Sequence, residues 1–120
     1  MGSPELASRL EDVLEAVATI GIYASGKTEA DYAADRMLRD AVERNIERIS
    51  EASRHIPGSL TATHPEIPWR KVADIGNILR HAYPIVDDSL NWEVVVRDLP
   101  PLKLAVEQML AELNAGETGE

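Results

Sequence analysis

Residues 69 to 83 read Trp-Arg-Lys-Val-Ala-Asp-Ile-Gly-Asn-Ile-Leu-Arg-His-Ala-Tyr, and this stretch predicts one helix around which the chain is organised. Pro68 precedes it, at a helix start where a missing backbone N–H costs nothing. Apolar residues recur at three- and four-residue steps, which is typical of a helix with one buried stripe: Val72, Ile75 and Leu79. Pro84 disfavours helical geometry in the residue before it, so we expect the helix to end near Ala82.

The composition predicts a small helical protein. The chain has 120 residues, which fits one domain, here residues 3–114, followed by a polar, flexible tail at 115–120. There is no Phe and there are only five other aromatic residues, which suits helix packing better than a sheet. The absence of cysteine excludes disulfides and thiolate metal sites.

Charge and hydropathy argue against a non-specific nucleic-acid-binding protein, a membrane-spanning protein and a secreted protein. The net charge of −9 opposes non-specific binding to nucleic acid, so any RNA chemistry must come from a local cluster of Arg and His. No apolar run is long enough to span a bilayer, and the N-terminus lacks a signal-peptide pattern. We therefore expect a cytoplasmic protein without membrane contact.

Two helices are predicted before the central one. The first begins with Ser3 as its cap and Pro4 at its first position, and ends at Gly26. Thr28 caps the second, with Asp31 as its capping-box partner, and the second helix is predicted to run to about His55. Its charged residues from Arg44 to Glu51 are interpreted as a solvated face, with Asp40 and Arg44 forming an ion pair.

Two more helices are predicted after a loop at 59–68 and the central helix. Asp87 or Asp88 caps a short one, and Asp98 caps the last, which holds Pro100 and Pro101 in its first turn. No segment is a convincing strand. Short connections favour antiparallel neighbours, so the sequence predicts an all-α, up-and-down four-helix bundle with an additional short helix.

The ordered motifs resemble a known family. Ile-Pro-Trp-Arg at 67–70 and Asn-Ile-Leu-Arg-His-Ala-Tyr at 77–83 resemble the central motif of HepT-like ribonuclease toxins in the HEPN superfamily. Asp40-Ala-Val and the run 45–52 resemble the family's second helix, and Val86-Asp87, Trp92 and 98–100 resemble its C-terminal part. The resemblance covers roughly Leu6 to Leu113. It implies an HEPN-like bundle, RNase activity and a minimal nucleotidyltransferase antitoxin as partner.

A polar cluster lies at the end of the central helix; the residue types suggest the roles of Arg80 and Asn77, and the resemblance supports those of His81 and Tyr83. His81 is the expected acid/base and Arg80 the expected phosphate-binding cation. Asn77 is the expected positioning residue, and Tyr83 is the site to which the antitoxin transfers AMP. Such cleavage needs a base, an acid and a cation, but no metal and no cofactor. Without the resemblance, a lone Arg-His pair at a helix end is more often a solvated terminus, and Tyr83 an ordinary tyrosine.

One position departs from the family pattern. The motif arginine stands five residues before the histidine, and here that position is Gly76. Glycine inside a helix is unfavourable, so we expect close approach of another helix or a ligand. Gly76 and the polar face of this helix indicate a close neighbour, and the resemblance implies a site between two chains, so we expect a homodimer that uses this helix. The departure also favours an alternative, a non-catalytic substrate-binding or regulatory subunit of a nucleotidyltransferase. A plain helical dimerisation module is a third possibility.

The remaining polar and aromatic residues have structural interpretations. His55 and His64 are expected to be solvated, and the histidines show no metal-ligand spacing. Trp69 and Trp92 are expected to anchor the packing. Asn45 falls beside an apolar face and needs a partner, either an interhelical hydrogen bond or a contact that supports the His81 cluster.

Overall fold

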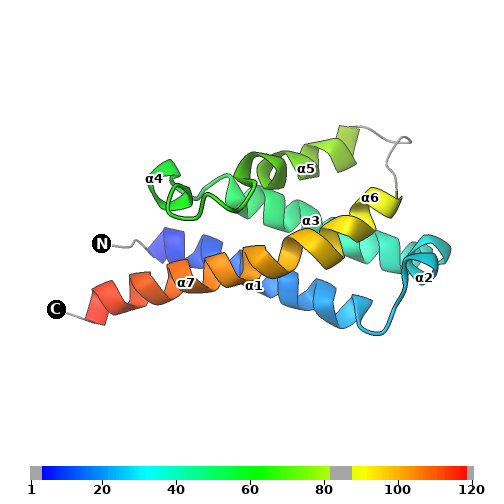
Figure 1. Cartoon of the computed structure of the whole chain (residues 1–120), viewed down its shortest axis with the longest axis horizontal. Helices are drawn as coiled ribbons and strands as arrows, with labels where there is room; N and C mark the ends of the chain where they lie inside the picture. The colour runs from blue at the N-terminus through cyan, green and yellow to red at the C-terminus, as the bar shows by residue number, and fades with distance from the viewer. Residues whose placement is uncertain (1–3, 82–87, 119–120) are drawn as a thin grey trace.

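The computed structural model describes residues 4–81 and 88–118, with side chains for 4–77 and 91–115. These residues form helices and connecting turns, without a strand among them, so the predicted all-α bundle is confirmed. Four long helices build it: α1 (Pro4–Ala24), α3 (Arg36–Ser53), α5 (Trp69–His81) and α7 (Leu99–Thr118). In Figure 1, α3 runs through the middle, with α5 along one side and α1 and α7 along the other.

The first helix follows its sequence signals. α1 begins at Pro4, and the chain leaves it through Gly26, whose φ of 74° favours glycine. Ser3, the predicted cap, lies outside the described residues. The apolar face of α1 supplies a large share of the core, which also takes in α3 and α7: Leu10, Val13, Val17, Ile20, Val42, Ile46, Ile49, Leu102, Val106 and Met109. Each of these side chains is buried.

The predicted second helix is two helices. Thr28 caps α2 (Glu29–Ala34) with both bonds of a capping box to Asp31, as predicted. The chain then becomes extended at Asp35, whose side chain accepts a hydrogen bond from the Leu38 N–H and caps α3. A single helix to His55 was therefore wrong. The break lets the buried Tyr32 of α2 stack on Trp92, with ring centroids 5.4 Å apart.

The loop before the central helix is partly ordered by helical turns. A short helix, α4 (Gly58–Thr61), occupies its first half. His64 is buried, against the prediction that it is solvated, and its Nδ1 lies 3.3 Å from a Glu66 carboxylate oxygen. The His64 carbonyl accepts a hydrogen bond from Trp69 Nε1 at 3.0 Å. This bond holds the start of α5, which confirms the anchoring role predicted for Trp69. The buried Trp92, in contact with Tyr32, has the anchoring role predicted for it as well.

The last two predicted helices form one continuous run. α6 (Asp88–Glu93) leads through a π-helical turn, η1 (Val94–Asp98), directly into α7 (Figure 1). Asp98 therefore does not cap a new helix, and the prediction of a break there was wrong. Its carboxylate instead accepts a hydrogen bond from Lys71 Nζ at 2.8 Å, which ties α5 to the start of α7. Asp87 lies outside the described residues.

The C-terminal helix is longer than the sequence predicts, since α7 continues to Thr118. None of the described helices is both long enough and apolar enough to cross a lipid bilayer.

Candidate functional site

The central helix forms as its sequence indicates. α5 begins directly after Pro68, and the Pro68 carbonyl accepts the Val72 N–H at 3.0 Å. Val72 is buried and Ile75 is half-buried against the core. α5 is described as far as His81, so Arg80 and His81 are its last described residues, and the predicted helix end near Ala82 lies outside the described residues.

Gly76 is where α5 meets α3. Ser50 Oγ donates to the Ala73 carbonyl at 2.6 Å and accepts the Gly76 N–H at 3.2 Å. A Cβ placed on Gly76 would lie 2.7 Å from Ser50 Oγ and 2.8 Å from Ser50 Cβ, closer than such atoms pack. The predicted close approach of another helix is therefore confirmed, and glycine is required there because the two helices touch.

The contact with Ser50 shows that Gly76 is not evidence for a dimer, contrary to the expectation from the sequence. Its close neighbour is Ser50 of the same chain, not a second protomer. An arginine at position 76 would have to displace α3 before its side chain could reach any substrate. The cation that a phosphate-cleaving site needs must therefore come from another position in this chain.

The structure describes the predicted site residues to different extents. Asn77 is exposed, in the turn that follows Gly76. Arg80 and His81 have described backbone positions in α5, while their side chains lie outside the described set. Tyr83 lies wholly outside the described residues. Because Asn77 precedes Arg80 by three residues and His81 by four, helical periodicity brings all three to adjacent positions on α5.

Asn45 is satisfied within its own helix. Its Nδ2 donates to the Ala41 carbonyl at 2.9 Å, and its Oδ1 accepts from Arg48 Nη1 at 2.9 Å. The interhelical hydrogen bond predicted for it is not among the bonds of the described residues. Asn45 therefore orients Arg48, whose other guanidinium nitrogen binds Glu15 of α1 at 2.6 Å.

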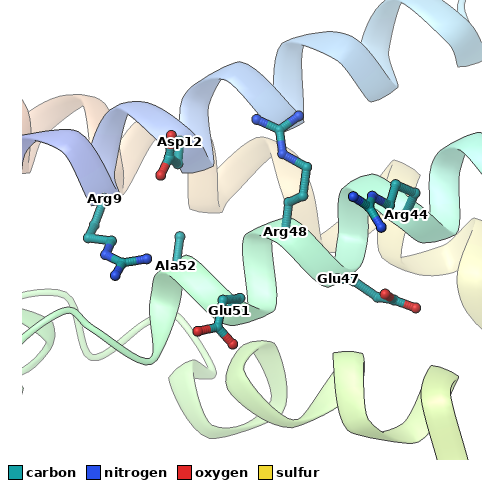
Figure 2. Close-up of a pocket in the computed structure, with 7 residues that line it drawn as sticks. All are labelled: Arg9, Asp12, Arg44, Glu47, Arg48, Glu51 and Ala52. Atoms are coloured by element: carbon teal, nitrogen blue, oxygen red, sulfur yellow. The ribbon is translucent and has the colours of Figure 1, made fainter.

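Sequence reasoning missed a charged groove between α1 and α3. It has a volume of about 320 Å³ and is lined by Ala52 and six charged residues: Arg9, Asp12, Arg44, Glu47, Arg48 and Glu51. Figure 2 shows Arg9 reaching from α1 toward α3 and Arg48 reaching from α3 toward α1. The i, i+4 spacing of Arg44 and Arg48 indicates one stripe of α3, but their position along the same groove as Arg9 depends on how the helices pack.

The carboxylate of Glu51 is held at the rim of this groove. His55 Nε2 lies 3.2 Å from one of its oxygens, and Arg54 Nη1 donates to the other at 2.9 Å. The His55 hydrogen bond, and then the nearby charge of Arg54, hold the pKa of the Glu51 carboxyl below its usual value of 4.5. Glu51 therefore stays ionised at neutral pH.

Metal ligands do not converge in the described part of the chain: no group of three or more His, Asp or Glu side chains lies there with the spacing that an ion needs. The charged groups found together are arginines and carboxylates, which suit binding of phosphate and of hydrogen-bond donors.

Similar proteins identify the family. The model of the family described as "Ribonuclease HepT-like" matches residues 13–109. A protein of Thermococcus cleftensis named "Probable ribonuclease HepT" is 39% identical over 83% of this chain and 91% of its own length. A protein of Methanocaldococcus jannaschii named "Putative RNase" is 32% identical over 89% of this chain and 98% of its own.

A further relative is matched over only half of its own length. A Methanocaldococcus jannaschii protein named "Gamma-glutamylcyclotransferase and putative RNase" is 36% identical over 92% of this chain, but the match spans only 50% of that protein. No solved structure matches this chain. The family model covers most of the bundle, from Val13 in α1 to Met109 in α7. The chain belongs to the HepT-like ribonuclease family.

Proposed function

We propose that this protein is a metal-independent endoribonuclease, the toxin of a toxin–antitoxin pair, with His81 as acid/base and Arg80 as phosphate-binding cation. The observation that carries this proposal is the last described part of α5 in a HepT-like chain, where Asn77, Arg80 and His81 occupy adjacent helical positions. Pro84 predicts that the helix ends near Ala82, and a helix C-terminus favours a cation, which supports a protonated His81.

The proposed reaction uses only groups of this chain and the RNA. A base removes the proton of a ribose 2′-hydroxyl, and the oxygen attacks the adjacent phosphorus. The bond to the 5′-oxygen breaks, and an acid supplies a proton to that leaving oxygen. The products are a 2′,3′-cyclic phosphate and a free 5′-hydroxyl. Arg80 stabilises the charge on the non-bridging oxygens without changing its own protonation.

The proposal includes two partners. We expect a homodimer in which His81 of one protomer and Arg80 of the other meet at one phosphate; the resemblance implies the shared site, and Arg80 takes the part of the motif arginine that Gly76 lacks. We also expect a nucleotidyltransferase antitoxin that transfers AMP to Tyr83. The added phosphate would repel RNA phosphate and block the site, which would silence the toxin. A mass increase of one or more AMP units after co-expression, lost in Tyr83→Phe, is the expected result.

Cleavage of RNA in EDTA tests the proposed activity. His81→Ala should abolish it, and Arg80→Gln should lower it by about a hundredfold or more, since one donor to a developing oxyanion typically contributes that much. Arg97→Gln is the matched control, because Arg97 is exposed on η1, pairs with Glu93 at 3.2 Å and is not part of the proposed site. Cleavage that survives His81→Ala would exclude His81 from the mechanism.

One observation favours the second candidate, a non-catalytic subunit of a nucleotidyltransferase. The family's arginine position is Gly76, and Ser50 fills the space that an arginine would need. Gly76→Arg is therefore not a clean test of activity, because it also disturbs the α3–α5 contact. Absence of cleavage by the folded protein, together with binding to a nucleotidyltransferase encoded beside it, would favour this candidate.

A further inference from the structure

The charged groove between α1 and α3 contains an arginine that is available to bind a ligand. Arg48 is fixed in place by its bonds to Asn45 and Glu15, and Glu51 is held by His55 and Arg54. Arg44 is exposed and takes part in none of the hydrogen bonds or ion pairs found among the described residues. The ion pair predicted between Asp40 and Arg44 is replaced by one between Asp40 and Arg36, 4.0 Å apart. Arg44 is therefore available to a ligand.

Most of the basic residues lie on α3 and α5. The chain has 12 Lys and Arg residues, and eight of them lie on α3, its C-cap and α5: Arg36, Arg39, Arg44, Arg48, Arg54, Arg70, Lys71 and Arg80. The rest of the molecule carries most of the acidic residues that give the net charge of −9. An RNA strand is therefore repelled least along the α3–α5 side.

The groove begins beside the proposed site. Ser50 contacts Ala73, whereas Glu47, one turn earlier on α3, lies against Gly76, with its Cα 3.7 Å from a Cβ placed there. The two helices are thus antiparallel, and Arg44 lies another turn toward the His81 end. Gly76 precedes His81 by five residues, which is about 7.5 Å along the helix axis.

The mixed charge of the groove indicates what kind of ligand fits. Three carboxylates would disfavour a bare anion beside the three guanidinium groups. A nucleotide offers both partners, because phosphate oxygens accept from arginine, and ribose hydroxyls and base amino groups donate to carboxylates. The volume of about 320 Å³ lies at the lower end of small-ligand sites, which suits a single nucleotide.

We propose that this groove holds one nucleotide of the RNA strand next to the cleaved phosphate, with Arg44 and Arg48 contacting its phosphate and Asp12 or Glu47 accepting from its ribose or base. The proposal rests on the ribonuclease function proposed above and extends it, because the groove would set where along α3 the substrate strand runs.

Binding of a 2′-O-methyl RNA oligonucleotide tests this proposal without cleavage, since the blocked 2′-oxygen cannot attack. Fluorescence anisotropy of the labelled oligonucleotide should show about tenfold weaker binding to Arg44→Gln than to the parent, the loss expected for one charged hydrogen bond. The slope of log affinity against log salt should also fall by about 0.7, the effect of one lost phosphate contact on a single strand.

Arg36→Gln is the matched control. It removes the same charge from the same helix, but its side chain is 86% exposed and does not line the groove. Equal binding by Arg44→Gln and Arg36→Gln would overturn the proposal, as would a parent that binds no RNA. Unchanged RNA binding with an altered sedimentation coefficient in Arg44→Gln would overturn it too, and would assign the groove to a protein contact.

The two proposals can fail separately. RNA binding that depends on Arg44, in a protein that never cleaves RNA, would support the nucleotide-binding groove and contradict the proposed ribonuclease activity. Cleavage that depends on His81, with RNA binding that is unchanged in Arg44→Gln, would support the proposed ribonuclease activity and contradict the nucleotide-binding groove.

Discussion

At the scale of the residue, Gly76 is the position where a sequence prediction can be compared most directly with a contact in the structure. A glycine in the middle of a helix predicts a close neighbour, and this much could be read from the sequence. The neighbour itself could not, because Ser50 lies 26 residues earlier and carries no signal of its own. The position where the family has its arginine thus serves packing in this chain, and the question of catalysis moves to Arg80.

Gly76→Ala should destabilise the protein. The added methyl meets Ser50 Oγ and Cβ, both close to the backbone of α3, so the helices must separate. Overpacking of this kind costs about 1–3 kcal/mol of unfolding free energy, which exceeds the gain in helix propensity. Urea unfolding followed by circular dichroism measures the change.

Gly21→Ala is the control for that substitution. It also lies in a helix, but nothing stands within 4 Å of its added Cβ. The unfolding free energy should therefore rise by about 0.5–1 kcal/mol, the usual gain for alanine over glycine in a helix. A Gly76→Ala protein as stable as Gly21→Ala would show that α5 and α3 do not touch as described.

At the scale of the element, the break at Asp35 is the feature that sequence reasoning missed. The apolar positions keep a helical spacing across it, and Asp35 is neither proline nor glycine, so periodicity alone gave no reason to stop. The bond from the Leu38 N–H to Asp35 makes the break a new helix start. The same reasoning located the cap at Thr28, where a capping box stands at the edge of the pattern.

Asp35→Ala should therefore lower the unfolding free energy by about 1 kcal/mol, the usual cost of a lost N-cap. Asp35→Asn should change it by much less, because the amide oxygen can accept the same N–H. Chemical denaturation of the two variants side by side is the measurement. Equal losses in both would mean that the side-chain cap contributes little and that α3 is held by packing alone.

The contacts of Glu51 with His55 and Arg54 at the end of α3 predict that the stability of the protein depends on pH. His55 and Arg54 lower the pKa of the folded Glu51 carboxyl below 4.5, so around that pH the unfolded chain binds more protons. The contribution of Glu51 is complete above 4.5 and is lost as the pH falls through the lowered folded value. Urea midpoints of the wild type should therefore drop more than those of Glu51→Gln between neutral pH and the acid range below 4.5. Parallel pH profiles would show that these contacts do not persist in solution.

At the scale of the whole molecule, periodicity and composition were enough to predict the helical bundle, because each long helix has one apolar stripe. The continuous path from α6 through η1 to α7 was not predictable, since Asp98 followed by two prolines resembles a capped helix start. The groove between α1 and α3 was not predictable either. Arg9 and Arg48 are far apart in sequence, and only the packing of the two helices brings them together.

The proposed shared site is a property of the whole assembly, and it predicts complementation. His81→Ala and Arg80→Gln should each be inactive, and neither chain has both groups. If His81 and Arg80 of different protomers meet, a dimer of one variant with the other has one intact site. Mixing the unfolded variants equally and refolding them should restore about a quarter of the wild-type activity, because half of the dimers are mixed and one site in two is whole.

Sedimentation at tens of micromolar (order of magnitude for a useful interface) decides whether that dimer exists, and a chain that stays monomeric there would exclude the shared site. A dimer without complementation would instead place both groups of each site on one protomer. In that case Arg80 and His81 act from the same turn of α5, and the partner protomer contributes stability instead of chemistry. Since Gly76 contacts Ser50 of its own chain, the case for a shared site rests on this measurement and on the family, and no longer on the glycine.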